Sequence, residues 1–155
     1  MPTLVPSRIT AQGVALALLA FSAGALAGSP INKTLLGGLA VDGYDVVAYQ
    51  TDHRPVEGKR DFQTDWQDAT WRFASAEHLK MFKADPERYA PQYGGYCAYG
   101  VGAKNYKVGI DPGAFTVIDG KLYLNYSKDV QTLWDADRAH FIQTADRNWP
   151  ALRDQ

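Results

Sequence analysis

Cys97 is the only cysteine in the 155-residue chain, so no internal disulfide can hold the fold together. The fold must therefore rest on a core of packed side chains, and the chain supplies 4 tryptophans and 9 tyrosines for it. Such an aromatic content is typical of a compact domain and does not fit a disordered one. The formal net charge is −1, which gives no reason to expect a nucleic-acid partner or an anionic membrane surface as partner.

Residues 1–27 have the layout of a secretory signal peptide. A weakly basic start at Arg8 precedes an apolar run from Val14 to Leu26, and Ala25-Leu26-Ala27 matches a small-residue cleavage site. The run is shorter than the ~20 residues that a membrane-spanning helix needs. We therefore expect cleavage after Ala27, a periplasmic or secreted protein, and no stable membrane insertion after cleavage. A retained anchor is the alternative.

We expect residues 28–41 to be a linker or opening segment and residues 42–152 to form one domain, a length that is enough for one core. Alternating aromatic residues predict a hairpin over 61–75, and Asp119-Gly120 predicts a second hairpin between 114–118 and 121–125. Ser75 and Ser127 are expected to cap helices, and Asp85-Pro86 to start a short one. The sequence therefore predicts an α+β fold, with helices packed on antiparallel hairpins.

Two predictions concern the ends of helices. Asp45 could cap a short helix that carries Val46, Val47 and Tyr49, although the same residues also suit a strand. At the other end of the chain, one final helix is expected after Ser127, because Val130, Trp134, Phe141 and Ala145 fall on one helical face. We expect 148–150 to close that helix, since Pro150 lacks the backbone N–H that a helix uses.

Four phrases of the sequence resemble the YHS domain family, and within it the stand-alone exported bacterial members. They are GYDVVAY at 43–49, WRFASAEH at 71–78, FKADPERYAPQYGGYCA at 82–98 and DGKLYLN at 119–125. Together the phrases span nearly all of the mature chain, and the long third phrase is the most specific. Shorter YHS modules are generally supposed to bind metal, so the resemblance implies metal binding. Those modules carry two cysteines where this chain has Ala74 and His78, which breaks the two-cysteine clip and leaves His78 as a candidate ligand.

The predicted metal ligands are Cys97, His78 and His53. A cysteine thiolate is a soft ligand that favours Cu(I) or Zn(II), and a neutral imidazole suits either ion. Structural zinc sites take four protein ligands, whereas two or three suffice for Cu(I). Copper is therefore the metal that we expect, with Cys97 and His78 as the main pair. A buried, inert thiol is the alternative role for Cys97.

Tyr93, Tyr96 and Tyr99 surround Cys97 in the sequence and could line a cleft for a small molecule or a protein partner. A binding module of this kind is the alternative to the metal-binding protein. A third hypothesis is a thiol enzyme with Cys97 as nucleophile and His78 as base, but the sequence shows no third orienting group. We therefore favour a protein without catalytic activity.

Overall fold

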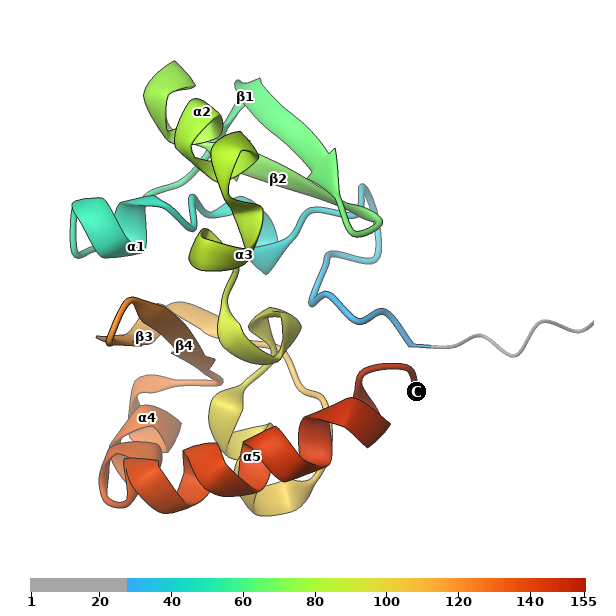
Figure 1. Ribbon diagram of the computed structural model, residues 1–155, viewed down its shortest axis with the longest axis vertical. Coiled ribbons are helices and arrows are strands. Elements are labelled where there is room, and N and C mark those ends of the chain that lie inside the picture. The colour runs from blue at the N-terminus through green and yellow to red at the C-terminus, as the bar shows by residue number, and fades with distance from the viewer. Residues whose placement is uncertain (1–27) are drawn as a thin grey trace, which may run out of the picture.

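The computed structural model describes residues 28–155 and shows the expected α+β architecture, with two antiparallel two-stranded hairpins packed against helices (Figure 1). The predicted signal peptide, residues 1–27, lies outside the described residues. None of the helices that the structure describes is long and apolar enough to cross a membrane. In chain order the elements are η1 (Val41–Gly43), α1 (Ala48–Thr51), β1 (Lys59–Trp66), β2 (Ala69–Phe73), α2 (Ala76–Ala84), α3 (Pro86–Tyr89), η2 (Gln92–Gly95), η3 (Gly100–Lys104), β3 (Asp111–Ile118), β4 (Lys121–Asn125), α4 (Lys128–Asp135) and α5 (Arg138–Leu152).

Both hairpins turn on two residues in the left-handed conformation. Gln67 and Asp68 have φ of 50° and 57°, and Asp119 and Gly120 have φ of 51° and 73°. Two successive positive φ values define the turn whose twist matches that of paired strands, so the predicted hairpin at 119–120 is confirmed. The hairpin predicted over 61–75 is also confirmed, with Trp66 paired to Ala69 across the turn.

The buried side chains form two clusters rather than one core. The upper core lies between the first hairpin, α1 and α2, and the lower core lies between β4, α4 and α5 (Figure 1). The buried residues of the upper core are Ile31, Ala40, Val41, Val46, Val47, Tyr49, Ala69, Trp71, Phe73, Phe82, Tyr89, Leu122 and Leu124. Those of the lower core are Tyr93, Ala98, Val101, Tyr123, Trp134, Ala145 and Leu152.

Strand β4 belongs to both cores. Leu122 and Leu124 point into the upper core, while Tyr123 between them packs in the lower core. Successive side chains of a strand face opposite sides, so a strand placed between two clusters must be apolar on both faces. Residues 122–125 are accordingly all buried.

Side-chain caps begin the helices where the sequence indicated them. The Ser75 hydroxyl accepts a hydrogen bond from the backbone N–H of His78 at 3.1 Å, and Ser127 accepts from Val130 at 3.2 Å. Asp85 caps α3 in the same way, with Pro86 as its first residue. The segment after Asp45 is helical rather than a strand, which resolves the alternative left open by the sequence.

The prediction of one final helix is wrong. The chain breaks after Asp135 into α4 and α5, because the Asp137 carboxylate accepts from the backbone N–H of His140 at 3.2 Å and starts a new helix. The predicted end at 148–150 is also wrong, since α5 continues through Pro150 to Leu152. Pro150 removes one hydrogen bond close to the end of the helix, and Leu152 is buried in the lower core.

The opening segment 28–41 contacts the rest of the fold. Leu39 forms a bridge to Thr70 of β2, and Lys33 forms one to Ala40. The backbone N–H of Asn32 donates to the carbonyl of Gly94 at 2.8 Å, and its side-chain amide donates to Gly95 at 3.0 Å. These bonds tie the segment to the turn that precedes Cys97.

Gly94 is expected to be intolerant of any side chain. Its φ is +61°, and a Cβ placed there would lie 1.9 Å from the carbonyl oxygen of Pro30. We expect Gly94→Ala to lower the free energy of unfolding by about 3 kcal/mol, as measured by urea denaturation. Gly120→Ala is the matched control, because Gly120 has a φ of +73° with no atom within 4 Å of its Cβ position. Gly120→Ala should lower the free energy of unfolding by about 1 kcal/mol, which is the cost of the left-handed backbone alone. Equal losses at the two positions would contradict the predicted clash.

Candidate functional site

A tight turn places Cys97 beside the end of β4. Tyr93, Gly94 and Gly95 have φ of 56°, 61° and 81°, three consecutive left-handed residues that reverse the chain. The backbone N–H of Cys97 then donates to Val108 at 3.1 Å, and its carbonyl accepts from Val101 at 3.0 Å. Both backbone groups of Cys97 are thus satisfied, and its side chain is fixed in direction.

The thiol of Cys97 is buried and makes three polar contacts. Its Sγ accepts hydrogen bonds from the backbone N–H of Gly100 at 3.4 Å and of Tyr126 at 3.3 Å. The thiol donates to Oδ1 of Asn125 at 3.6 Å. Burial raises the pKa of the Cys97 thiol, and the backbone N–H groups of Gly100, Tyr126 and Tyr99 oppose that rise only in part. The group is therefore a neutral thiol at physiological pH.

Asn125, the last residue of β4, connects the thiol to the neighbouring backbone. It is fully buried, and its Oδ1 also accepts from the backbone N–H of Tyr99 at 3.2 Å. Its Nδ2 has no hydrogen-bond partner among residues 28–155. A buried amide group without a hydrogen-bond partner lowers the free energy of unfolding, so the fold is locally destabilised next to the thiol.

A cavity of about 350 Å³ opens onto the thiol. We call it the thiol pocket, and it is lined by Cys97, Tyr99, Gly100, Lys104, Tyr106, Val108, Tyr126 and Val130. Tyr106 and Tyr126 are 49% and 57% exposed and are two of the five most exposed large apolar side chains in the described chain. The two rings therefore lie at the outer part of the pocket, with Cys97 at its buried end.

The polar groups of the thiol pocket have few protein partners. Among residues 28–155, no hydrogen bond or ion pair is formed by the hydroxyls of Tyr99, Tyr106 and Tyr126 or by the ammonium of Lys104. By contrast, the hydroxyls of Tyr93 and Tyr96 donate at 2.9 Å to Asp146 and to the carbonyl of Ser29. Three phenols and one cation at one cavity are thus free to meet a ligand.

A second polar site surrounds His78, the first-turn histidine of α2. The buried Asp45 carboxylate accepts from the backbone N–H groups of Val47, Ala48 and Ala74 and lies 2.6 Å from Nδ1 of His78. Since both carboxylate oxygens act as acceptors, Nδ1 is the donor in this pair, which leaves Nε2 as the other nitrogen of the ring. Nε2 lies 3.4 Å from the Thr51 hydroxyl and 4.0 Å from the Asp52 carboxylate.

The predicted metal ligands do not meet in this conformation. α2, with His78, is in the upper half of the molecule, and the segment that carries Cys97 is in the lower half (Figure 1). His53 lies on the surface beyond α1 with a φ of 53°. Within the described part of the chain, no group of three or more His, Cys, Asp or Glu side chains could hold a metal ion.

The three predicted ligand-binding tyrosines lie at three different places. Tyr99 lines the thiol pocket, where its ring packs edge-on against Phe141 at 5.1 Å between centroids. Tyr93 lines a second, larger cavity. Tyr96 lines neither, and its hydroxyl instead holds the opening segment at Ser29.

The sequence analysis missed most of the thiol pocket. Lys104 ends η3 and Tyr106 and Val108 follow it, while Tyr126 lies between β4 and α4 and Val130 lies in the first turn of α4. One feature of the sequence indicated Tyr126. This residue directly follows the hairpin predicted at Asp119-Gly120, at the end of a strand, where a side chain can leave the sheet. The position of 104–108 depends on the five-residue π-helix η3, for which sequence periodicity gives no indication.

Comparison of the chain with protein-family models, with curated proteins and with solved structures finds no match. The resemblance to the YHS family therefore stays a prediction.

The environment of Cys97 predicts slow alkylation. Because burial raises its pKa and encloses Sγ, we expect iodoacetamide at pH 8 to modify the native protein at least roughly tenfold more slowly than the urea-unfolded chain. The rate should rise with pH as thiolate forms, and Tyr126→Ala should raise it by opening the outer part of the pocket. Leu133→Ala, on an exposed face of α4, is the control. Native alkylation as fast as that of the unfolded chain would contradict an enclosed neutral thiol.

Proposed function

We propose that this protein is a binding module for a small organic molecule, which occupies the thiol pocket. The observation that carries the proposal is a cavity whose lining groups, three tyrosine hydroxyls and the Lys104 ammonium, have no partner among the described residues. Ligand pockets combine apolar walls with a few polar groups that fix orientation. Val108, Val130 and the tyrosine rings supply such walls here.

The lining suggests the chemistry of the ligand. The volume of about 350 Å³ is at the small end of known ligand sites. The one charged group is Lys104, and phenol hydroxyls readily donate to an oxygen acceptor. A small aromatic or short aliphatic carboxylate satisfies these conditions, with its apolar body on the valines and tyrosines and its carboxylate at Lys104.

The state of Cys97 favours binding over nucleophilic catalysis. A reactive cysteine is usually a thiolate of lowered pKa near a base or a cation, whereas burial raises the pKa of Cys97. Its hydrogen-bond partners are two backbone N–H groups and an amide oxygen, and His78 is not among them. The proposal therefore gives the thiol a role in shaping the buried end of the pocket.

Ligand-observed NMR and calorimetry with a panel of carboxylates, including benzoate and phenylacetate, would test the proposal. We expect at least one acid to bind at micromolar to millimolar concentration. Its neutral amide analogue should bind several-fold more weakly, because it lacks the charge contact with Lys104. Lys104→Ala should abolish that preference for the acid, and Val130→Phe should abolish binding by filling the pocket.

Leu133→Phe is the matched control, because it adds a similar ring on the exposed face of the same helix. Absence of binding across the panel would refute the proposal. Binding that Val130→Phe leaves unchanged would place the ligand elsewhere and would refute it equally.

Metal binding, above all copper binding by an exported protein of the YHS type, is the second candidate. The observation that favours it is the orientation of His78 by Asp45, since metal-ligating histidines usually donate their other ring nitrogen to a carboxylate or carbonyl. The Asp52 carboxylate, 4.0 Å from Nε2, is the nearest further ligand. In this form of the hypothesis, His78 is the central ligand and Cys97 takes no part.

Titration of the reduced protein with Cu(I) and Zn(II) against a competing chelator separates the forms of the metal hypothesis. We expect His78→Ala to weaken binding most and Asp45→Asn to weaken it by about tenfold or more by releasing the ring. Cys97→Ser is then the control that should change nothing. Loss of binding in Cys97→Ser alone would mean that the metal binds in the thiol pocket. Loss of binding in both Cys97→Ser and His78→Ala would support the Cys97–His78 pair predicted from the sequence. Failure of either ion to bind would end this candidate.

A further inference from the structure

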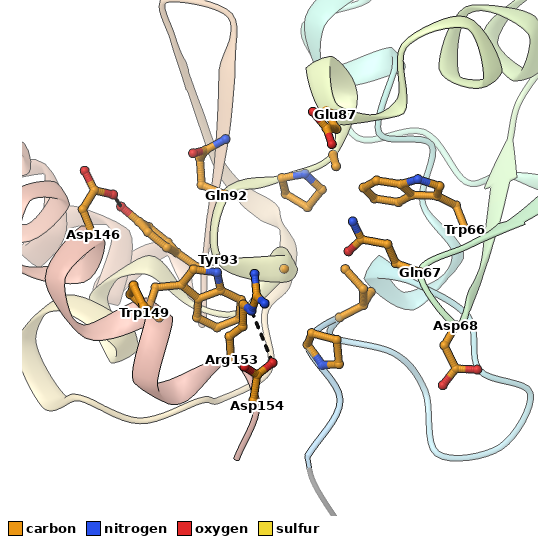
Figure 2. Close-up of a pocket in the computed structure, with 16 residues that line it drawn as sticks. Trp66, Gln67, Asp68, Glu87, Gln92, Tyr93, Asp146, Trp149, Arg153 and Asp154 are labelled. Carbon is orange, nitrogen blue, oxygen red and sulfur yellow. Dashed lines mark hydrogen bonds and ion pairs between the residues drawn. The ribbon is translucent and has the colours of Figure 1, made fainter.

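A second cavity, of about 830 Å³, lies between the two cores. We call it the inter-core cleft (Figure 2). One wall carries Trp66 and Gln67 from the first hairpin, and the facing wall carries Tyr93 and Trp149. Trp66 packs against the upper core, whereas Tyr93 and Trp149 belong to the lower core. The cleft is therefore built by the meeting of the two clusters and shares no lining residue with the thiol pocket.

The aromatic walls of the cleft are held in place from behind. Trp66 packs edge-on against Trp71 and Phe82, at 5.6 and 5.7 Å between ring centroids. Trp149 is edge-on to Tyr93 at 6.1 Å. Both indoles are only partly buried, so each keeps surface that faces the cleft or solvent. Rigid rings with free surface suit a ligand that presents a flat apolar patch.

The polar groups around these rings lack protein partners. Among residues 28–155, no hydrogen bond is formed by the side chains of Gln67, Gln92 and Glu87 or by the indole N–H groups of Trp66 and Trp149. Figure 2 shows the Gln67 amide directed into the space between the walls. These groups include donors, acceptors and two amides that are both.

Two of the four carboxylates that line the cleft are paired with a cation. Asp68 is paired with Lys33 at 2.8 Å, and Asp154 with Arg153 at 3.3 Å. Asp146 accepts the Tyr93 hydroxyl at 2.9 Å. Glu87 has no partner among the described residues, so the cleft keeps two carboxylates without a cation, which disfavours an anionic ligand.

We infer that the inter-core cleft binds a neutral carbohydrate. A sugar ring offers a face of C–H groups to an aromatic side chain and a rim of hydroxyls that both donate and accept hydrogen bonds. The cleft offers the matching set: rings on opposite walls, two free amides, one free carboxylate and two indole N–H donors. Its larger volume leaves room for more than one sugar ring, with one unit against each tryptophan.

The inference is tested by calorimetric titration of the protein with a panel of neutral di- and trisaccharides built from glucose, galactose, mannose and N-acetylhexosamines. We expect at least one to bind at micromolar to millimolar concentration. Trp149→Ala should weaken that sugar by about tenfold or more, on the scale of one lost stacking ring. Gln67→Ala should weaken it several-fold by removing a free amide.

Two controls keep the result interpretable. Gln67 is exposed and lies in a turn, so its variant should fold normally even if Trp149→Ala does not. Val130→Phe, which fills the thiol pocket, should leave sugar binding unchanged and thereby separates this site from the proposed function.

Three outcomes would overturn the inference. They are no binding by any sugar at millimolar concentration, binding that neither Trp149→Ala nor Gln67→Ala reduces, and preference of the cleft for spermidine or a lysine-rich peptide over every sugar.

Discussion

The structure depends on a strand that is buried on both faces. β4 supplies Leu122 and Leu124 to the upper core and Tyr123 to the lower core, so the two clusters share it. The strand pairs only with β3 in a two-stranded hairpin, and isolated hairpins of that size are marginally stable in water. Its stability must therefore come from burial on both sides, and each core in turn needs the strand to close it.

The candidate sites follow from this arrangement. Asn125 ends β4, and its buried amide fixes both the Cys97 thiol and the backbone at Tyr99. Tyr126, which directly follows the strand, and Val130 of α4 then line the thiol pocket. On another side, the boundary between the clusters remains open as the inter-core cleft. One pocket thus lies at the end of the shared strand, and the other where the two clusters face each other.

Local chemistry made much of the fold predictable. Asp119-Gly120, Ser75, Ser127 and Asp85-Pro86 each act through backbone conformation or a cap within a few residues, so the sequence alone locates them. The break at Asp137 was missed because Trp134 and Phe141 are two helical turns apart, a spacing that fits one helix as well as two that meet at a cap. Hydrophobic periodicity indicates which residues are buried, but it does not indicate where the helix axis changes direction.

The sites were less predictable, because long-range packing decides them. Cys97 was singled out as a candidate residue, but two of the three hydrogen-bond partners of its thiol come from residues 28 and 29 positions away. The Asp45–His78 pair spans 33 positions, and the capping role expected for Asp45 gave no sign of it. Tyr93, Tyr96 and Tyr99 are close in the sequence but point in different directions, because the chain reverses at the three left-handed residues 93–95.

The inter-core cleft has one wall in each cluster, and this affects how its shape can change. Its width is set by the placement of the two clusters against each other and not by the packing within either one. β4 and the passage from Tyr89 to Tyr93 join the clusters along the chain. The shape of the cleft therefore depends on how the two clusters meet, whereas the shape of the thiol pocket depends on the end of β4.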